Sequence, residues 1–208
     1  MTRRTPGPGS ASPPKPLSPH GKTPAPERLL DAAEARLLKL GPAGLVLDAV
    51  AKEAGVSKGG LLYHFPSKDA LVAGLTDRML DGFDAVQDTI AGGDTHPAGR
   101  WTRAYLASTV DARGEAADGS ARLMAGILAG IGGDPTRLDA IRERFEAWQR
   151  RLESDAIDPT TATLVRLAAD GLWLSALLGL RRFDPELIQG VLTRLREMTR
   201  SADPDPAE

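Results

Sequence analysis

The chain has 208 residues, of which 41% are hydrophobic and only 4% aromatic, a composition that favours a sizeable helical core over an aromatic-rich β-sandwich. It contains no cysteine, which excludes disulfides, thiolate catalysis, cysteine-ligated zinc and iron–sulfur clusters, and a reducing cytoplasm is the expected location. The net charge of −2 combines +4 over residues 1–76 with −6 over residues 77–208, so a polyanionic partner is expected to meet the N-terminal third.

The two ends of the chain differ in composition from its body. Residues 1–26 hold eight of the 16 prolines and four basic residues but no acidic one, and we expect this tail to be disordered. Its basic residues are either solvated or in contact with a phosphate backbone, and the sequence leaves both readings open. No apolar run follows Arg3 and Arg4, so neither a signal peptide nor a membrane anchor is expected. Residues 201–208 are acidic and interrupted by proline, and we expect a second disordered tail there.

Four N-terminal segments repeat apolar residues at helical spacing. They are residues 29–40, 47–54, 57–65 and 68–91, and the first three form a compact unit by length and spacing. Glycine or proline follows each segment, as expected where a helix ends. No segment alternates apolar and polar residues as a half-buried strand would.

Five longer helices are predicted in the remainder. Their apolar stripes lie near residues 101–106, 123–131, 138–152, 164–180 and 187–198. The segment 164–180 is apolar nearly all round but carries Arg166 and Asp170, so we predict a helix buried on two sides and not a membrane span. The sequence therefore predicts an all-α protein of about nine helices.

Residues 47–68, LDAVAKEAGVSKGGLLYHFPSK, are the most informative stretch. Two short helices joined by Gly55-Val56-Ser57 have the geometry of a helix-turn-helix, since glycine supplies the turn conformation and valine fills the angle between the helices. The second helix of such a unit fits the major groove of DNA. On that helix Leu61 and Phe65 are predicted to face inward.

In this stretch the chain resembles the tetracycline-repressor (TetR) family of transcriptional regulators. The match rests on Ala51, the Ala54-Gly55-Val56-Ser57 turn, Lys58-Gly59, Leu61, His64-Phe65-Pro66-Ser67-Lys68 and Leu71. The resemblance implies a homodimer, an operator of two-fold symmetry, and a C-terminal domain that binds a small molecule. The implied domains are a tail (1–26), a DNA-binding domain (27–75), an effector-binding and dimerisation domain (76–200) and an acidic tail (201–208).

Two residues depart from the family pattern. Val46 stands where such proteins have Thr or Ser, so a side-chain N-cap worth ~1 kcal/mol is expected to be missing, with partial compensation from Asp48 in the first turn. Gly60-Leu61-Leu62 replaces the usual Thr-Leu-Tyr. The recognition helix therefore has fewer polar side chains with which to read bases.

The DNA-binding candidates lie on and just after this helix. They are Ser57, Lys58, Gly59, Gly60, Leu62, Tyr63, His64 and Lys68. Lys58 is suited to guanine O6 and N7, and Leu62 to a thymine methyl. Tyr63, His64 and Lys68 are expected on phosphates. The alternative is that these are ordinary solvated side chains.

The C-terminal body supplies candidates for a ligand cavity and a dimer interface. The cavity candidates are Trp101, Tyr105, Met124, Ile127, Phe145, Trp148 and Trp173, each of which could equally be plain core. The interface candidates, small or apolar residues on the last two helices, are Ala168, Gly171, Ser175, Gly179, Leu187, Val191 and Leu195. We predict that these two helices pair with their copies in a four-helix interface.

These observations favour one function over two others. A ligand-responsive DNA-binding regulator, acting as a repressor released from a palindromic operator by an apolar or aromatic effector, accounts for the helix-turn-helix, the charge asymmetry and the helical body. An enzyme accounts for none of them, and no catalytic, cofactor or metal site is expected. A helical scaffold or adaptor without DNA binding is the alternative, but it leaves Ser57 to Lys68 unexplained.

Overall fold

The structure, a computed structural model, describes residues 23–115, 120–131, 138–180 and 183–200. This part of the chain is all-α, with nine α-helices and no strand, and the predicted fold class is confirmed. The helices are α1 (Ala25–Leu40), α2 (Leu47–Ala54), α3 (Lys58–His64), α4 (Lys68–Gly93), α5 (Arg100–Thr109), α6 (Ser120–Ile131), α7 (Asp139–Glu153), α8 (Pro159–Leu178) and α9 (Pro185–Met198), with a short 3₁₀ turn η1 (Pro42–Gly44) after α1.

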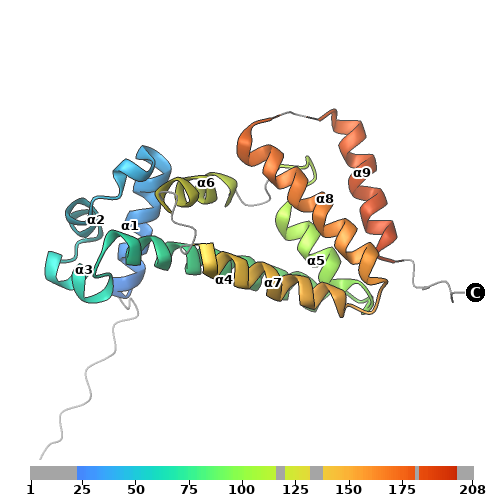
Figure 1. Cartoon of the computed structure of the whole chain (residues 1–208), viewed down its shortest axis with the longest axis horizontal. Coiled ribbons are helices and arrows are strands. Elements are labelled where there is room, and N and C mark those ends of the chain that lie inside the picture. Colours follow the sequence, from blue (N-terminus) through green and yellow to red (C-terminus); the bar gives the residue numbers. More distant parts are fainter. Residues whose placement is uncertain (1–22, 116–119, 132–137, 181–182, 201–208) are drawn as a thin grey trace, which may run out of the picture.

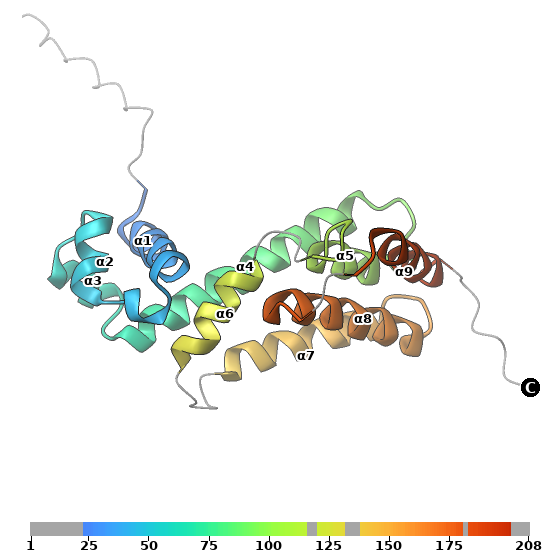
Figure 2. The same cartoon turned by 90° about the horizontal axis from the view of Figure 1, so that it is seen from above.

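The molecule is elongated, with two groups of helices at opposite ends. Helices α1, α2 and α3 gather at one end, whereas α5, α8 and α9 lie at the other (Figures 1 and 2). Helix α4, 26 residues long, runs between the ends and belongs to both. The expected domain boundary at residues 75 and 76 therefore falls inside one continuous helix.

The N-terminal unit is closed around an apolar cluster. Leu29, Val50, Leu61 and Leu71 have no exposed surface, and they bring α1, α2, α3 and the start of α4 together. Two positive backbone angles make the turns possible, φ +67° at Gly41 and φ +63° at Gly55, where a side chain would be strained.

Helix α1 begins slightly earlier than the sequence predicted. Ala25 and Pro26 are helical, although both were expected to belong to the disordered tail. Proline is favoured in the first turn because its fixed φ suits a helix and its missing amide hydrogen has no partner there. The rest of the expected N-terminal tail, residues 1–22, and the acidic tail, residues 201–208, lie outside the described residues.

The C-terminal body is built around a second cluster. Leu106, Leu152, Val165 and Leu192 are buried in it and come from α5, α7, α8 and α9. Ion pairs then tie α7 to α4: Arg144 binds Asp81 at 2.8 Å and also pairs with Asp84.

Within the single chain helix α8 is buried on one side, and burial of its second side stays a prediction about the dimer. Val165 and Ala169 face the core, but Leu164 is 51% exposed and Leu167 is 61% exposed. Among the described helices only α8 is long and apolar enough to cross a membrane by length and composition. Its charged residues Arg166 and Asp170 contact side chains of α7 and α5.

Candidate functional site

The turn between α2 and α3 has the geometry that its sequence predicts. Gly55 is left-handed, and the amide of Val56 donates to the carbonyl of Ala51 at 2.9 Å. The Ser57 hydroxyl oxygen accepts from the Gly60 amide at 3.0 Å and caps α3. Helix α2 has no side-chain cap at Val46, as expected. The turn holds α3 outward with only Leu61 fully buried.

The outer face of α3 carries exposed side chains that the fold does not need. Tyr63 is 84% exposed and Leu62 is 38% exposed, while Lys58 and His64 also face water. The Tyr63 ring meets the His64 ring edge-on at 5.0 Å. Tyr63 buries so little of its surface that it gains almost nothing for the stability of the fold, so this face is suited to a partner.

The two lysine candidates have partners within the chain. The Lys58 ammonium lies 2.9 Å from a carboxylate oxygen of Asp48, and both side chains are more than half exposed, so the pair is weak. Lys68 is more tightly held, because its Nζ donates to the Pro42 carbonyl at 2.9 Å in a half-buried site. Lys68 thus ties α4 to η1, a structural role that the sequence did not indicate.

The adjacent glycines of α3 differ in what a side chain would meet. A Cβ at Gly60 would lie 3.0 Å from Val56 and 3.2 Å from Ser57, whereas a Cβ at Gly59 would meet nothing within 4 Å. Glycine in a helix costs up to about 1 kcal/mol relative to alanine. Gly60 is therefore explained by packing inside the chain, and Gly59 is not.

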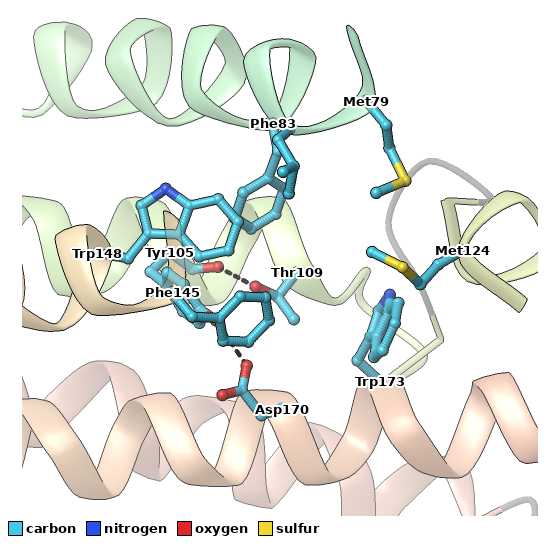
Figure 3. A pocket seen from close by; sticks show the side chains of 10 residues that line it. Met79, Phe83, Tyr105, Thr109, Met124, Phe145, Trp148, Asp170 and Trp173 are labelled. Atoms are coloured by element: carbon cyan, nitrogen blue, oxygen red, sulfur yellow. Dashed lines mark hydrogen bonds between the residues drawn. The ribbon is translucent and has the colours of Figure 1, made fainter. Parts of the chain in front are cut away.

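A cavity opens in the C-terminal body between α4, α5, α6, α7 and α8 (Figure 3). Its volume, taken as the space open to the centre of a water molecule, is about 60 Å³. It is lined by Met79, Leu80, Phe83, Tyr105, Thr109, Met124, Phe145, Trp148, Asp170 and Trp173. Such a mostly apolar hollow with few polar groups is typical of small-molecule sites.

Aromatic rings come from five of the ten lining residues. The Phe83 and Trp148 centroids are 4.8 Å apart, and those of Phe145 and Trp148 are 4.9 Å apart. Trp148 is fixed in place because its indole Nε1 donates to Asp84 at 2.5 Å. The rings are thus preorganised by packing and by one hydrogen bond.

One charged side chain, Asp170, lies among the described lining residues. Its Oδ1 accepts from the Tyr105 hydroxyl at 2.6 Å, and its Oδ2 lies 3.5 Å from Nε of Arg166. Burial raises the pKa of Asp170, against the opposing effects of Tyr105 and Arg166. Burial, followed by the charge of Asp170, raises the pKa of Tyr105. The Tyr105 hydroxyl therefore donates a hydrogen bond to Asp170 and keeps its proton, so the phenol is neutral.

Five of the seven predicted cavity residues line this hollow, and two do not. Ile127 is fully buried in the N-terminal cluster instead. Trp101 lies under the guanidinium of Arg151, 4.5 Å from its ring centroid, at the start of α5. The sequence missed Met79, Leu80, Phe83, Thr109 and Asp170, because the packing of α4 and α5 decides which face of each helix borders the hollow.

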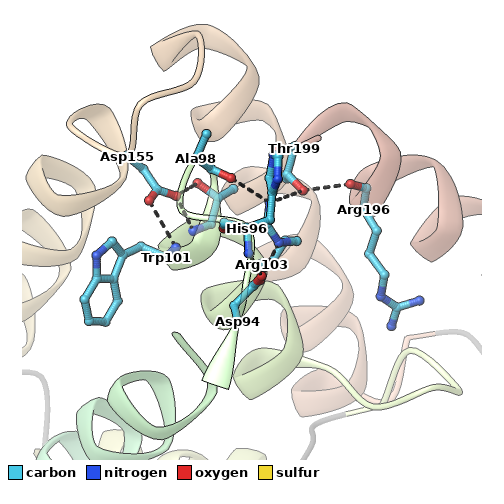
Figure 4. A network of polar contacts seen from close by, with 9 residues as sticks. Asp94, His96, Ala98, Trp101, Arg103, Asp155, Arg196 and Thr199 are labelled. Carbon is cyan, nitrogen blue, oxygen red and sulfur yellow. Dashed lines mark hydrogen bonds and ion pairs between the residues drawn. The ribbon is translucent and has the colours of Figure 1, made fainter. Parts of the chain in front are cut away.

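Trp101 belongs to a polar network outside the cavity lining, one turn before Tyr105 on α5 (Figure 4). The Asp155 carboxylate accepts from the amides of Trp101 and Thr102, at 3.1 and 2.7 Å. Nearby, the buried Arg103 binds Asp94 at 2.7 Å and the Thr199 carbonyl at 3.0 Å. The hydrogen bond from Arg103 lowers the pKa of Asp94. This network fixes the ends of α4, α5 and α9 together.

Two family models match the chain over more than two thirds of its length. Residues 29–75 match the model described as bacterial regulatory proteins of the tetR family, and residues 99–200 match the tetracyclin repressor-like C-terminal domain. The chain belongs to the TetR family of transcriptional regulators. The resemblance seen in residues 47–68 is thereby confirmed. No curated protein sequence matches the chain.

Solved structures of other regulators share the fold of this TetR-family protein. A transcriptional regulator from Rhodococcus sp. Rha1 is 24% identical, with a TM-score of 0.64 over 84% of this chain and 95% of its own. A TetR-family member from Streptomyces coelicolor A3 is 26% identical, with a TM-score of 0.55 over 82% and 97%. The multidrug binding protein EbrR, complexed with malachite green, is 27% identical, with a TM-score of 0.54 over 82% and 96%.

The last two helices of this TetR-family protein place the interface candidates differently. Gly171, Leu187 and Val191 are exposed, and Ser175 is half-buried, with its hydroxyl donating to the Gly171 carbonyl at 2.8 Å. Leu195 is 8% exposed and packs inside the C-terminal cluster, and Ala168 packs against the same cluster. Gly179 is the C-cap of α8 at φ +61°.

These placements correct the predicted stripe of small residues. Leu195 faces the chain's own core, and Gly179 ends α8 instead of lying on its face. The exposed stripe of α8 consists of Leu164, Leu167, Gly171, Leu174 and Leu178. Its members are three and four residues apart, so they lie on one side of the helix.

Proposed function

We propose that the chain is a homodimeric, ligand-responsive transcriptional repressor of the cytoplasm, without catalytic activity. In this proposal α3 enters the major groove of a palindromic operator, and a small aromatic effector in the cavity releases the protein from DNA. One observation carries the proposal: α4 begins beside α3 and continues unbroken to the cavity, where Met79, Leu80 and Phe83 line the wall.

The outer face of α3 supports the DNA contacts. Lys58 and Leu62 are exposed there, and we assign them to base edges, with Tyr63 and His64 on phosphates. Ser57 holds the start of α3, and Gly59 allows the groove to approach the backbone. Gly60 and Lys68 act mainly through packing and through the Pro42 carbonyl. We therefore place less of the phosphate binding on Lys68 than its sequence position implied.

Helix α6 provides a second connection between cavity and DNA-binding unit. Met124 lines the cavity, while Ile127, less than one turn later, is buried in the N-terminal cluster. Gly126 lies so close to α1 that a Cβ there would be 2.8 Å from Leu37. A ligand that moves Met124 would shift α6 against α1. Such a ligand weakens DNA binding only if it favours a conformation of the dimer in which the spacing of the recognition helices does not match the spacing of the operator half-sites.

The effector class rests on the lining and on a relative. Phe83, Tyr105, Phe145, Trp148 and Trp173 border the hollow, and rings of a ligand would stack among them. EbrR, at 27% identity, binds the aromatic dye malachite green. We therefore expect an aromatic effector in this cavity.

The exposed apolar stripe of α8 supports the dimer. Leu164, Leu167, Leu174 and Leu178 are each 46 to 61% exposed, and Leu187 and Val191 add to this face from α9. A Cβ at Gly171, in the middle of the stripe, would meet nothing within 4 Å. Leucines around a glycine let a second copy approach closely, and an isologous contact gives the two-fold symmetry that a palindromic operator requires.

Binding to DNA that flanks the chain's own gene tests the function. Fluorescence anisotropy with such a fragment is expected to show salt-dependent binding. Removing Lys58 or Leu62 should cost ~1 to 3 kcal/mol on the preferred site and relax the preference at one base pair in each half-site. Asp77→Asn, on α4 away from α3, serves as the control. A protein that binds no DNA would favour a helical scaffold.

A further inference from the structure

The cavity contains an acid in surroundings that favour a cation. Among the described lining residues, Asp170 carries the one formal negative charge, and no lysine or arginine lines the hollow. Five aromatic residues border the same space, and the face of an aromatic ring attracts cations and repels anions. Carboxylate and rings therefore select for the same sign of charge.

The Asp170 carboxylate retains capacity to bind a ligand. A carboxylate offers about four acceptor positions, and among the described residues one hydrogen bond fills them, from the Tyr105 hydroxyl at 2.6 Å. The side chain is 30% exposed and projects from α8 toward Phe145 and Tyr105 (Figure 3). An incoming donor can thus reach the carboxylate from the cavity.

Arg166 neutralises this carboxylate only in part. Its Nε stands 3.5 Å from Oδ2, too far for a good hydrogen bond, and that nitrogen is buried without a partner among the described residues. Its Nη1 is held elsewhere, donating to Gln149 at 2.6 Å. Arg166 therefore leaves acceptor positions of the Asp170 carboxylate open to a ligand.

The chain itself shows that these rings accept a cation. The Arg166 guanidinium lies 5.3 Å from the ring centroid of Phe145 and 5.7 Å from that of Tyr105. Both distances are within the range of a cation–π contact. Arg166 does not itself line the cavity, and the two rings that it approaches are two of the five aromatic residues that do.

We propose that the cavity selects organic monocations, with the ligand's positive centre beside the Asp170 carboxylate and its apolar part among the aromatic rings. This inference rests on the proposed ligand-binding role of the cavity and deepens it by naming the charge of the ligand. Asp170 is then the residue that determines specificity. The aromatic wall supplies most of the contact area, which neutral molecules of the same shape share.

Two probes of the same shape and different charge test the inference. Benzyltrimethylammonium carries a quaternary nitrogen, and 2,2-dimethylpropylbenzene has a neutral carbon at that position. Binding to the full chain without DNA is followed by tryptophan fluorescence, since Trp148 and Trp173 line the cavity. The cation is expected to bind at least roughly tenfold more tightly than the neutral probe, because its quaternary nitrogen, which has no hydrogen to donate, gains an ion pair with Asp170 and cation–π contacts with the rings.

Two variants assign the preference to a residue. Asp170→Asn keeps the shape and the acceptor for Tyr105 but removes the charge. It should abolish the preference for the cationic probe, because it weakens the binding of that probe and leaves the affinity for the neutral probe unchanged. Asp88→Asn is the control, because Asp88 is a 61% exposed carboxylate on α4 that pairs with Arg151 and does not line the cavity. It should leave both affinities unchanged.

Three results would overturn the inference. They are equal affinity of the wild-type protein for both probes, no binding of either at millimolar concentration, and an undiminished cation preference in a folded Asp170→Asn protein. The wild-type comparison stands even where that variant fails to fold. Release of bound operator DNA is measured separately. Selective binding without release would contradict the proposed effector role alone, and release by both probes equally would contradict charge selection alone.

Discussion

The DNA-binding unit and the C-terminal body differ in what they bury. Over residues 23–75 every side chain that the structure places in the core is apolar, whereas the body buries Gln87, Arg103, Asp155 and Arg166. An apolar core needs no partner to be complete. The stability of the body depends on a hydrogen-bond partner for each buried polar group. The DNA-binding unit has no such requirement in its core.

Within the body, two arginine–aspartate pairs show the same contrast on a smaller scale. Arg103 donates to Asp94 and to carbonyls of His96, Ala98 and Thr199. Among the described residues Arg166 leaves its Nε without a hydrogen bond, at 3.5 Å from Asp170. The completed network holds helices together, and the incomplete one borders the cavity.

The largest effect is expected from a substitution that disrupts the exposed apolar stripe of α8. Leu167→Glu places a charge in the middle of the exposed stripe of α8 and should convert the dimer to a 22.0 kDa monomer. Operator affinity should fall by roughly 100-fold, because one recognition helix alone then has to hold its half-site. Sedimentation velocity and anisotropy measure the two effects. Thr193→Glu, exposed on α9 away from Val191, is the control, and a dimeric Leu167→Glu protein would refute the proposed interface.

The next effect concerns the satisfied polar network. Asp155 is 4% exposed and caps the start of α5, so Asp155→Ala should destabilise the protein by about 2 to 4 kcal/mol through amides left without a partner. Denaturant unfolding followed by tryptophan fluorescence reports this, since all three tryptophans lie in the body. Asp158→Ala removes the exposed cap of α8 and should cost less. Equal losses would mean that burial of the cap does not matter.

Acid should distinguish the two arginine–aspartate pairs of the body by a smaller amount. The pKa of Asp94 is lowered in the folded state by its hydrogen bond with Arg103, so its contribution is fully present above about pH 4 and is lost as the pH falls through the folded pKa. The pKa of Asp170 is raised by burial, so protonation of this group favours folding. Stability measured from pH 6 to pH 3 should fall less in Asp94→Asn than in the wild-type protein. An unchanged slope would contradict the role of Asp94.

The smallest effect has opposite signs in stability and in DNA binding. Gly59→Ala should raise stability by up to about 1 kcal/mol, because alanine favours the helix and a Cβ there meets nothing. It should nevertheless weaken operator binding if α3 approaches DNA closely at this point. Gly60→Ala should lower stability through Val56, and Gly82→Ala, equally open on α4, should leave DNA binding unchanged. Tighter operator binding by Gly59→Ala would exclude the close approach.

Local chemistry in the sequence was enough to specify the DNA-binding unit. Three features of this unit depend on residues within a few positions of one another: the turn at Gly55, the cap at Ser57 and the inward position of Leu61. Such local features can be predicted from the sequence alone. Helix ends marked by glycine and proline followed from the same local rules. The family followed too, because its motif lies in this continuous stretch.

Only the packing of distant helices decided the rest. Helical spacing shows that a helix has an apolar face but not what that face meets, and so Ile127 lies against α1, Leu195 lies inside the body and Trp101 lies beside Arg151. Asp170 became a cavity residue because α8 turns it toward Tyr105, 65 positions away. The bond between Lys68 and Pro42 likewise joins residues 26 positions apart. Contacts at such separations depend on how whole helices pack, which no local pattern records.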